Sequence, residues 1–172
     1  EIFNERMNIA EDALVYRVER TKEATPANAP ILYQYGAFGH RLGKEESVDQ
    51  LFKNRRATVS LGYIGLYEVA TVFFGNSWES NPDAKEFTLD IIRDMKRRVE
   101  EWSDQYGYHF SIYSTPSESL TDRFCRLDTD KFGSIPDITD KEYYTNSFHY
   151  DVRKNPTPFE KLDFEKVYPE AG

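Results

Sequence analysis

The sequence predicts an α/β fold, in which parallel strands alternate with helices that pack outside the sheet. Three observations predict it. A β-branched apolar run at 57–61 leads through a glycine turn into a helix, a long amphipathic pattern covers 82–106, and an alternating pattern at 108–113 is followed at once by another helix start. Parallel strands need long crossover connections, usually helical, so the order strand, helix, strand, helix favours parallel pairing.

The N-terminal region predicts an amphipathic helix of twenty or so residues. Its apolar side chains recur every three or four residues and therefore share one face; they are Phe3, Met7, Ala10, Leu14 and Val18. The stretch 24–30, with two prolines, ends the pattern. Further on, Ser47 and Gln50 fit a capping box that opens a short helix running to about Asn54.

Residues 57–74 predict a strand, a turn and a helix. The run 57–61 is β-branched and apolar, and Gly62 and Gly65 then permit a tight turn. The apolar segment 66–74 follows as a helix.

The longest predicted helix covers 82–106. Asn81 is a good N-cap, Pro82 suits the first helical position, and Gly107 can take the left-handed conformation that ends helices. One stripe of this helix is expected to be buried; it consists of Phe87, Ile91, Met95, Val99 and Trp102.

A strand is expected at 108–113, and a second capping box, Thr115 with Glu118, follows it directly. The helix that this box opens carries the apolar positions Leu120, Phe124 and Leu127.

The last part of the chain predicts one more strand and one more helix. Residues 144–150 read as the strand, and Thr157 with Glu160 opens the short helix by the same capping logic.

Composition excludes several classes of function. At 172 residues the chain is long enough for one compact domain or part of a larger one. Its 30 acidic and 22 basic side chains give a net charge of −8, which argues against nucleic-acid and membrane-surface partners. No apolar window approaches the roughly 20 residues that span a bilayer, and no signal peptide is recognisable, so we expect a cytoplasmic protein.

The chain is expected to be a segment of a longer protein. It starts without Met, inside a helical pattern, and carries 12 Tyr and 12 Phe, a large aromatic content for its length. Its single cysteine, Cys125, excludes an internal disulfide and any multi-cysteine zinc or iron–sulfur site made by this chain alone.

The segment 114–119 is the best candidate for a binding site. It lies at the carboxyl end of a predicted strand, where α/β proteins gather ligands. Its hydroxyls and the free amides of the following helix favour an anion such as phosphate without any lysine or arginine. On the residues alone, a plain helix cap made by Thr115 and Glu118 is the favoured explanation of the segment, because such boxes are common helix starts.

Other chemistry-bearing residues point to structural roles. The basic run 53–56 precedes a strand and is expected to be a solvated surface. The three histidines, His40, His109 and His149, show no metal-ligand spacing and are expected in the core or behind a site. Cys125 lies within a predicted helix and is expected to be a buried, inert thiol.

Several strings, in order along nearly the whole chain, resemble the anaerobic (class III) ribonucleotide reductases. They are EIFNERM at 1–7, RRATVSLGYIG at 55–65, YSTPSESL at 113–120, YYTNSFH at 143–149 and NPTPFE at 155–160. The resemblance implies an internal fragment of the large catalytic subunit.

The resemblance also implies a fold and a parent protein. Residues 1–172 would be a single segment of a ten-stranded α/β barrel, of the ribonucleotide reductase and glycyl-radical enzyme type, contributing its second half only. The N-terminal allosteric region, the thiyl-cysteine region and the C-terminal glycyl-radical domain would lie outside this segment. A glycyl-radical string, a four-cysteine zinc site and a Met-Gly-Cys segment have no match here.

By the resemblance, the parent reduces ribonucleoside triphosphates to deoxyribonucleotides by glycyl and thiyl radical chemistry. A thiyl radical removes the 3′ hydrogen of the ribose, and a glutamate that corresponds to Glu118 accepts the 3′ hydroxyl proton. Tyr113 would line the same pocket. The substrate phosphates would be bound by Ser114, Thr115, Ser117 and Ser119.

The fragment itself would hold no cofactor or metal and is not expected to be active alone. For the parent, the resemblance implies a glycyl radical made by an S-adenosylmethionine iron–sulfur activase, a C-terminal zinc site, ATP and dNTP effectors, and a homodimer. Two other readings stay open at this point: a fragment of a pyruvate formate-lyase type glycyl-radical enzyme, or a non-catalytic interaction module.

Overall fold

A computed structural model describes residues 1–37, 39–116 and 118–172, without the side chains of Asn54 and Glu118. The described residues form two compact units. Unit 1 comprises Glu1–Leu61 and Arg98–Ser111, and unit 2 comprises Gly62–Arg97 and Ile112–Gly172. Each unit is described by itself below.

The chain is mixed α/β. Its α-helices are α1 (Ile2–Lys22), α2 (Pro30–Tyr33), α3 (Leu66–Phe74), α4 (Pro82–Tyr106), α5 (Glu118–Phe132), α6 (Pro158–Glu165) and α7 (Tyr168–Ala171), and its strands are β1 (Thr58–Tyr63) and β2 (His109–Ser114). Short 3-10 turns lie at Pro26–Asn28, Val48–Leu51, Lys53–Arg55, Trp78–Ser80 and Val152–Lys154.

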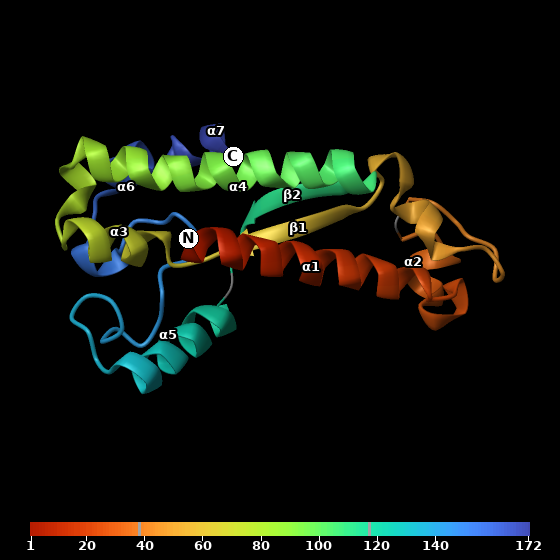
Figure 1. Cartoon of the computed structure of the whole chain (residues 1–172), viewed down its shortest axis with the longest axis horizontal. Helices are drawn as coiled ribbons and strands as arrows, with labels where there is room; N and C mark the ends of the chain where they lie inside the picture. The colour runs from red at the N-terminus through yellow and green to blue at the C-terminus, as the bar shows by residue number, and fades with distance from the viewer. Residues whose placement is uncertain (38, 117) are drawn as a thin grey trace. The chain divides into compact units, whose positions relative to one another are not determined.

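The two strands pair side by side and run in the same direction (Figure 1). Near their starts, Thr58 Oγ1 lies 3.1 Å from His109 Nδ1, and near their ends Tyr63 Oη lies 3.1 Å from Ser114 Oγ. The expected parallel pairing is therefore confirmed. The carboxyl ends of both strands lie at the same edge of the sheet.

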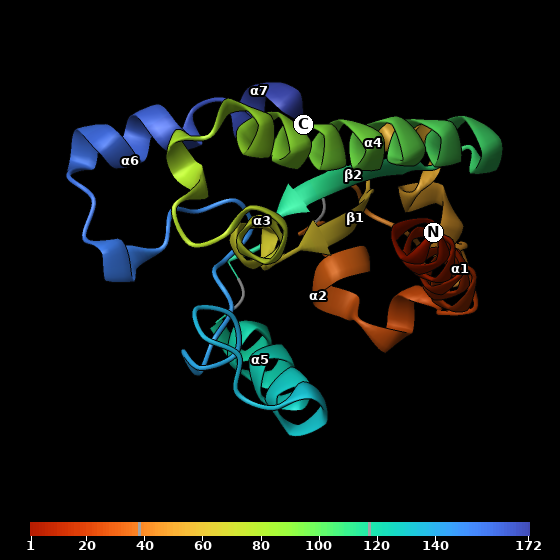
Figure 2. The same ribbon diagram turned by 60° about the vertical axis from the view of Figure 1, so that its left-hand side comes forward.

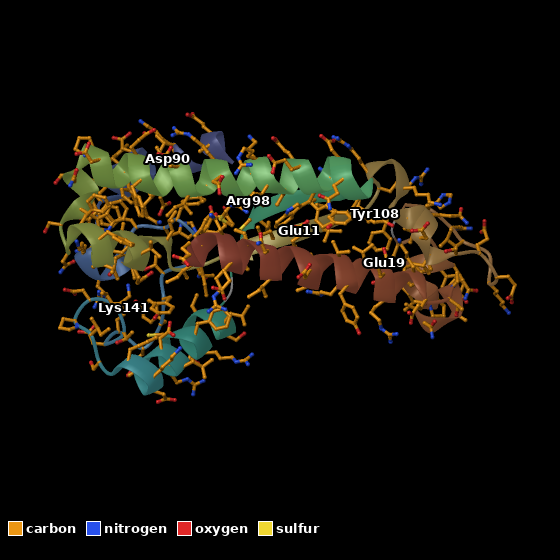
Figure 3. The ribbon with its side chains drawn as sticks, viewed as in Figure 1. Glu11, Glu19, Asp90, Arg98, Tyr108 and Lys141 are labelled. Carbon is orange, nitrogen blue, oxygen red and sulfur yellow. The ribbon has the colours of Figure 1, made fainter. Side chains whose placement is uncertain are left out.

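In unit 1, one face of α1 contributes buried side chains to the core. Met7 and Val18 of the predicted apolar face are buried, whereas Phe3 stays partly exposed. Within the same unit, the Trp102 and Phe110 rings meet edge to face with centroids 6.0 Å apart. Tyr106 Oη donates a hydrogen bond of 2.8 Å to Glu11 on α1; Figure 3 labels Glu11.

Unit 2 has an aromatic core. Its buried cluster consists of Leu66, Tyr67, Ala70, Trp78, Ala84, Leu89, Ile92, Phe164 and Tyr168. The Thr88 and Tyr168 hydroxyls are 2.9 Å apart inside this core. After α5 the chain turns back along that helix (Figures 1 and 2), and Cys125 Sγ reaches the Thr139 carbonyl oxygen at 3.6 Å.

The strongest local signals in the sequence predicted helix ends correctly. Asn81 Oδ1 accepts hydrogen bonds from the amides of Asp83 and Ala84 at 3.0 and 3.4 Å, and Gly107 ends α4 with φ +72°. The capping box of α6 is also confirmed, because Thr157 Oγ1 accepts from the Glu160 amide and Glu160 Oε2 accepts from the Thr157 amide.

Two local predictions need correction. Ser47 caps its short 3-10 turn by accepting from the Asp49 amide at 3.2 Å, while Gln50 donates to Glu46 instead of completing a box. The predicted turn at 62–65 begins too early, because β1 continues through Gly62 to Tyr63.

The predicted strand at 144–150 is wrong. Only Asn146 forms a bridge, an antiparallel one with Ile64, and Ser147 has φ +39°, which no strand accommodates. Thr145 and Ser147 are buried; Thr145 donates to Glu68, and the Ser147 carbonyl oxygen accepts from the Leu66 amide at 3.3 Å. Tertiary packing thus overrides the local β pattern.

The predicted apolar stripe of α5 is exposed. Leu120, Phe124 and Leu127 are 38 to 52% exposed, while Thr121 and Cys125 on another face are buried. The short helix α7 was not predicted. Among the described residues, no helix combines the length and the apolar character of a membrane span.

Candidate functional site: the loop between β2 and α5

The predicted anion loop leaves the sheet where β2 ends at Ser114. Tyr113 is 52% exposed, and Ser114 is exposed while its hydroxyl contacts that of Tyr63. Burial raises the pKa of Tyr63, against the lowering effect of the bond to Ser114. The Tyr63 hydroxyl therefore stays protonated at neutral pH and anchors the start of the loop.

A close approach of backbone and side chain fixes the next residue. Thr115 Oγ1 donates to the Tyr113 carbonyl oxygen at 3.2 Å. A Cβ atom on Gly62 would come well within 3.0 Å of Thr115 Oγ1, closer than real Cβ contacts allow. Glycine at position 62 is thus what lets the loop cross the end of β1.

The loop leads into the N-terminus of α5, a helix of 15 residues. The first amides of such a helix have no carbonyl partner within the helix and carry its positive dipole end, so they favour an anion. Ser119 is exposed on this first turn. Ser117, the side chain of Glu118 and the capping contact predicted for it lie outside the described residues.

The first turn of α5 is tied to the end of β1 through the segment 144–147. The Tyr144 amide donates to the Thr121 carbonyl oxygen at 3.1 Å, and the Gly65 amide donates to the Thr145 carbonyl oxygen at 2.8 Å. The helix start that follows the loop and the end of the neighbouring strand β1 are thereby held by one stretch of chain.

A buried ion cluster, defined as Glu68, Lys141, Thr145 and Asp151, holds that stretch. Lys141, labelled in Figure 3, forms ion pairs with Glu68 and with Asp151, the latter at 3.3 Å. Glu68 Oε1 also accepts from the amide and the hydroxyl of Thr145 at 2.9 and 2.6 Å. All three charged side chains are at most 4% exposed, so their mutual pairing is required to offset desolvation.

Asp151 has a strongly lowered pKa. Burial would raise it, but hydrogen bonds from the Arg153 side chain and amide, with the charge of Lys141, lower the pKa to about 2 from 3.8. Because the folded pKa is depressed, Asp151 stabilises the fold above about pH 4, and this contribution of roughly 2 kcal/mol is lost as pH falls towards 2.

We therefore expect the difference in unfolding free energy between wild type and Asp151→Asn to be largest above about pH 4 and to shrink towards pH 2. Urea titrations at several pH values, followed by fluorescence of the buried Trp78 in a Trp102→Phe background, measure it. A difference that does not change with pH would contradict the role given to Asp151.

Sequence reasoning missed the ion cluster. One signal was available, since Glu68 is the lone charged residue in the otherwise apolar or hydroxylic helix α3 and a charge on such a helix needs a partner. No signal marked Lys141, which stands in a polar run between Asp140 and Glu142.

The basic run at 53–56 and Cys125 lie in the surroundings that the sequence predicted, but the histidines need a correction. Lys53, Arg55 and Arg56 are exposed, and Cys125 is fully buried, which raises the pKa of its thiol. The three histidines are only partly buried, so a core location is wrong for them. Among the described residues no three His, Cys, Asp or Glu side chains are grouped so that they would hold a metal ion.

Comparison with known proteins identifies the family to which the chain is similar. A family model described as anaerobic ribonucleoside-triphosphate reductase matches residues 1–171. The chain is 46% identical over 169 residues to the protein of that name from Escherichia coli (strain K12), and 47% identical over 171 residues to that from Salmonella typhimurium (strain LT2). It is 45% identical over 168 residues to that from Enterobacteria phage T4.

These alignments cover 98% of this chain but only 24 to 26% of each relative. The chain thus spans about a quarter of the length of the relatives that it matches. The resemblance drawn from the five sequence strings is confirmed, and the chain belongs to the anaerobic ribonucleoside-triphosphate reductase family.

Proposed function

We propose that the chain is a segment of the catalytic subunit of an anaerobic reductase that converts ribonucleoside triphosphates to deoxyribonucleotides, and that it supplies the loop that binds the substrate phosphates. The observation that carries the proposal is the loop itself, which runs from the end of β2 into the N-terminus of α5 and is pressed against Gly62. The relatives named above bear the name of this activity.

In this proposal the loop residues have separate tasks. The hydroxyls of Ser114, Thr115, Ser117 and Ser119, with the free amides of the first turn of α5, hold the phosphates without a cation. Tyr113 lines the ribose pocket. Glu118 accepts the proton of the 3′ hydroxyl, and this requires its carboxylate within hydrogen-bond reach of that hydroxyl.

The cofactor sites implied for the parent do not fit the residues of this segment. Cys125, its single cysteine, is fully buried beside the Thr139 carbonyl, and the described residues offer no metal-ligand cluster. We therefore propose that the thiyl cysteine and the zinc site belong to the remainder of the parent. By the family resemblance, we propose the same for the glycyl radical made by an S-adenosylmethionine iron–sulfur activase and for the ATP and dNTP effector sites. We also propose that β1 and β2 are two strands of its ten-stranded barrel, and that the parent is a homodimer.

Titration of the isolated chain with a ribonucleoside triphosphate tests the phosphate loop. We expect CTP, and also inorganic tripolyphosphate, to shift the amide NMR signals of Ser119 and Leu120, because both anions approach the free amides of α5. Signals that move elsewhere while this first turn stays unchanged would refute the assignment.

Gly62→Ala should weaken CTP binding about tenfold, which corresponds to roughly 1.4 kcal/mol. The new Cβ would displace Thr115 and with it the start of the loop. Gly43→Ala is the matched control, because a Cβ there meets Glu46 only at ordinary contact distance, 3.4 Å. Equal CTP affinity in wild type and Gly62→Ala would show that the close approach does not shape the site.

A further inference from the structure

The apolar side chains along one face of α5 are exposed to solvent in unit 2. Leu120, Phe124 and Leu127 recur at the spacing of a buried helix face, yet all three are exposed. On α3, Val69 and Val72 are exposed as well. A contiguous apolar surface of this kind marks a site of contact.

Phe124 and Leu127 of α5, with Val69 and Val72 of α3, line one groove between these two helices. Its volume is about 350 Å³, and its apolar lining consists of Ile64, Val69, Val72, Phe124, Leu127 and Ile138. The rest of the lining is Gly65, Glu68, Asp128 and Tyr144. All of these residues belong to unit 2.

The polar part of the lining is acidic. Glu68 Oε2 is buried and accepts no hydrogen bond from any residue that the structure describes, although Oε1 of the same carboxylate has several donors. Asp128 Oδ2 accepts from the Tyr144 hydroxyl at 2.7 Å. Burial raises the pKa of Tyr144, and the bond to Asp128 adds to this, so the hydroxyl remains a donor.

The charges that line the groove determine which kind of chemical group it can bind. Two carboxylates line it, and the described lining contains no Lys, Arg or His. A buried carboxylate oxygen without a donor is costly and is normally satisfied in a complete structure. An anion or a purely apolar group would leave Glu68 Oε2 unpaired, whereas a guanidinium or ammonium group on an apolar stem satisfies both parts of the groove.

We propose that the groove between α3 and α5 binds a polypeptide segment from the rest of the parent chain, which lays apolar side chains along Phe124, Leu127 and Val72 and places an Arg or Lys beside Glu68 and Asp128. The relatives are about four times as long as this chain, so the same polypeptide has ample length to supply the segment. The identification of the occupant as part of the parent chain rests on the proposed function. The apolar and acidic character of the groove is independent of that function.

Small-molecule probes test the chemistry of the groove on the 172-residue chain. Hexylguanidinium should shift the NMR signals of Val69, Val72 and Leu127 at about tenfold lower concentration than 1-hexanol, because its cation is paired with carboxylates. Asp128→Asn should reduce this preference, and Asp122→Asn, on α5 outside the groove lining, should not. Equal binding of the two probes, or a preference for hexanoate, would overturn the proposal.

Photocrosslinking in the full-length reductase identifies the occupant. A benzoylphenylalanine at position 72 should form a crosslink within the same chain, to a peptide outside these 172 residues that contains Arg or Lys. The same group at Phe159, which is exposed but outside the groove, is the control. A crosslink at position 72 to a second copy or to another protein, or none at all, would contradict the proposal. This readout needs no reductase activity, so loss of the proposed function and loss of the proposed docking are distinguishable.

Discussion

Glu118→Gln in the full-length reductase is expected to lower the rate of ribonucleotide reduction by about 10²- to 10⁴-fold, the usual contribution of a positioned general base. Glutamine keeps the size of the side chain but does not accept the 3′ hydroxyl proton. Turnover of a ribonucleoside triphosphate after activation, with the glycyl radical quantified by electron paramagnetic resonance, measures the effect.

The control for this variant is Glu170→Gln, which changes an exposed glutamate on α7. The radical yield should be the same in wild type and both variants, because residue 118 has no proposed part in radical formation. If Glu118→Gln retained most of its turnover at an equal radical yield, the proton would have to go elsewhere and the role proposed for Glu118 would be wrong.

Lys141→Met should destabilise unit 2 by about 3 to 5 kcal/mol, the usual result of removing one partner from a buried ion pair. The variant removes the Lys141 cation from Glu68 in a site where the side chains are at most 4% exposed, and among the described residues Arg153 remains as the cation beside Asp151. Urea unfolding followed by Trp78 fluorescence in a Trp102→Phe background reports on this unit.

Arg126→Met is the matched control for Lys141→Met, since Arg126 also pairs with a carboxylate, Asp122, but in an exposed position. Exposed pairs contribute little, so its unfolding curve should nearly overlay that of wild type. A loss below about 1 kcal/mol for Lys141→Met would mean that the ion cluster does not hold the segment 144–147 in place.

Local signals in the sequence predicted the helices well because each is a short-range effect. The Asn81 cap, the Gly107 end and the Thr157 capping box act within one turn of their helix, and the structure has all three. The parallel strands were also predictable, because their β-branched and alternating patterns needed no distant partner to be recognised.

The failures occur where distant residues decide the conformation. The segment 144–150 has a strand-like pattern, but the bonds of Thr145 to Glu68 and the positive φ of Ser147 hold it as a loop. The apolar positions of α5 have the spacing of a buried helix face, yet Phe124 and Leu127 line an open groove and Leu120 is exposed. Neither outcome is encoded within a window of a few residues.

The candidate site was predictable in part. Its position between β2 and α5 followed from the strand pattern and the helix start, and the assignment of roles within it came from the family resemblance. Two other features of the site depend on residues more than 20 positions away from the loop in the chain. They are the close approach of Thr115 to Gly62 and the bonds by which Lys141 holds the segment 144–147. No local pattern in the sequence predicted either feature.

A crystal structure of the full-length reductase with a bound ribonucleoside triphosphate would show whether the loop between β2 and α5 holds the substrate phosphates. We expect phosphate oxygens within about 3.2 Å of the first backbone amides of α5, the distance of a normal N–H···O hydrogen bond, with the ribose beside residue 118. A triphosphate bound elsewhere in the protein, with no contact to residues 114–119, would refute the proposed phosphate loop.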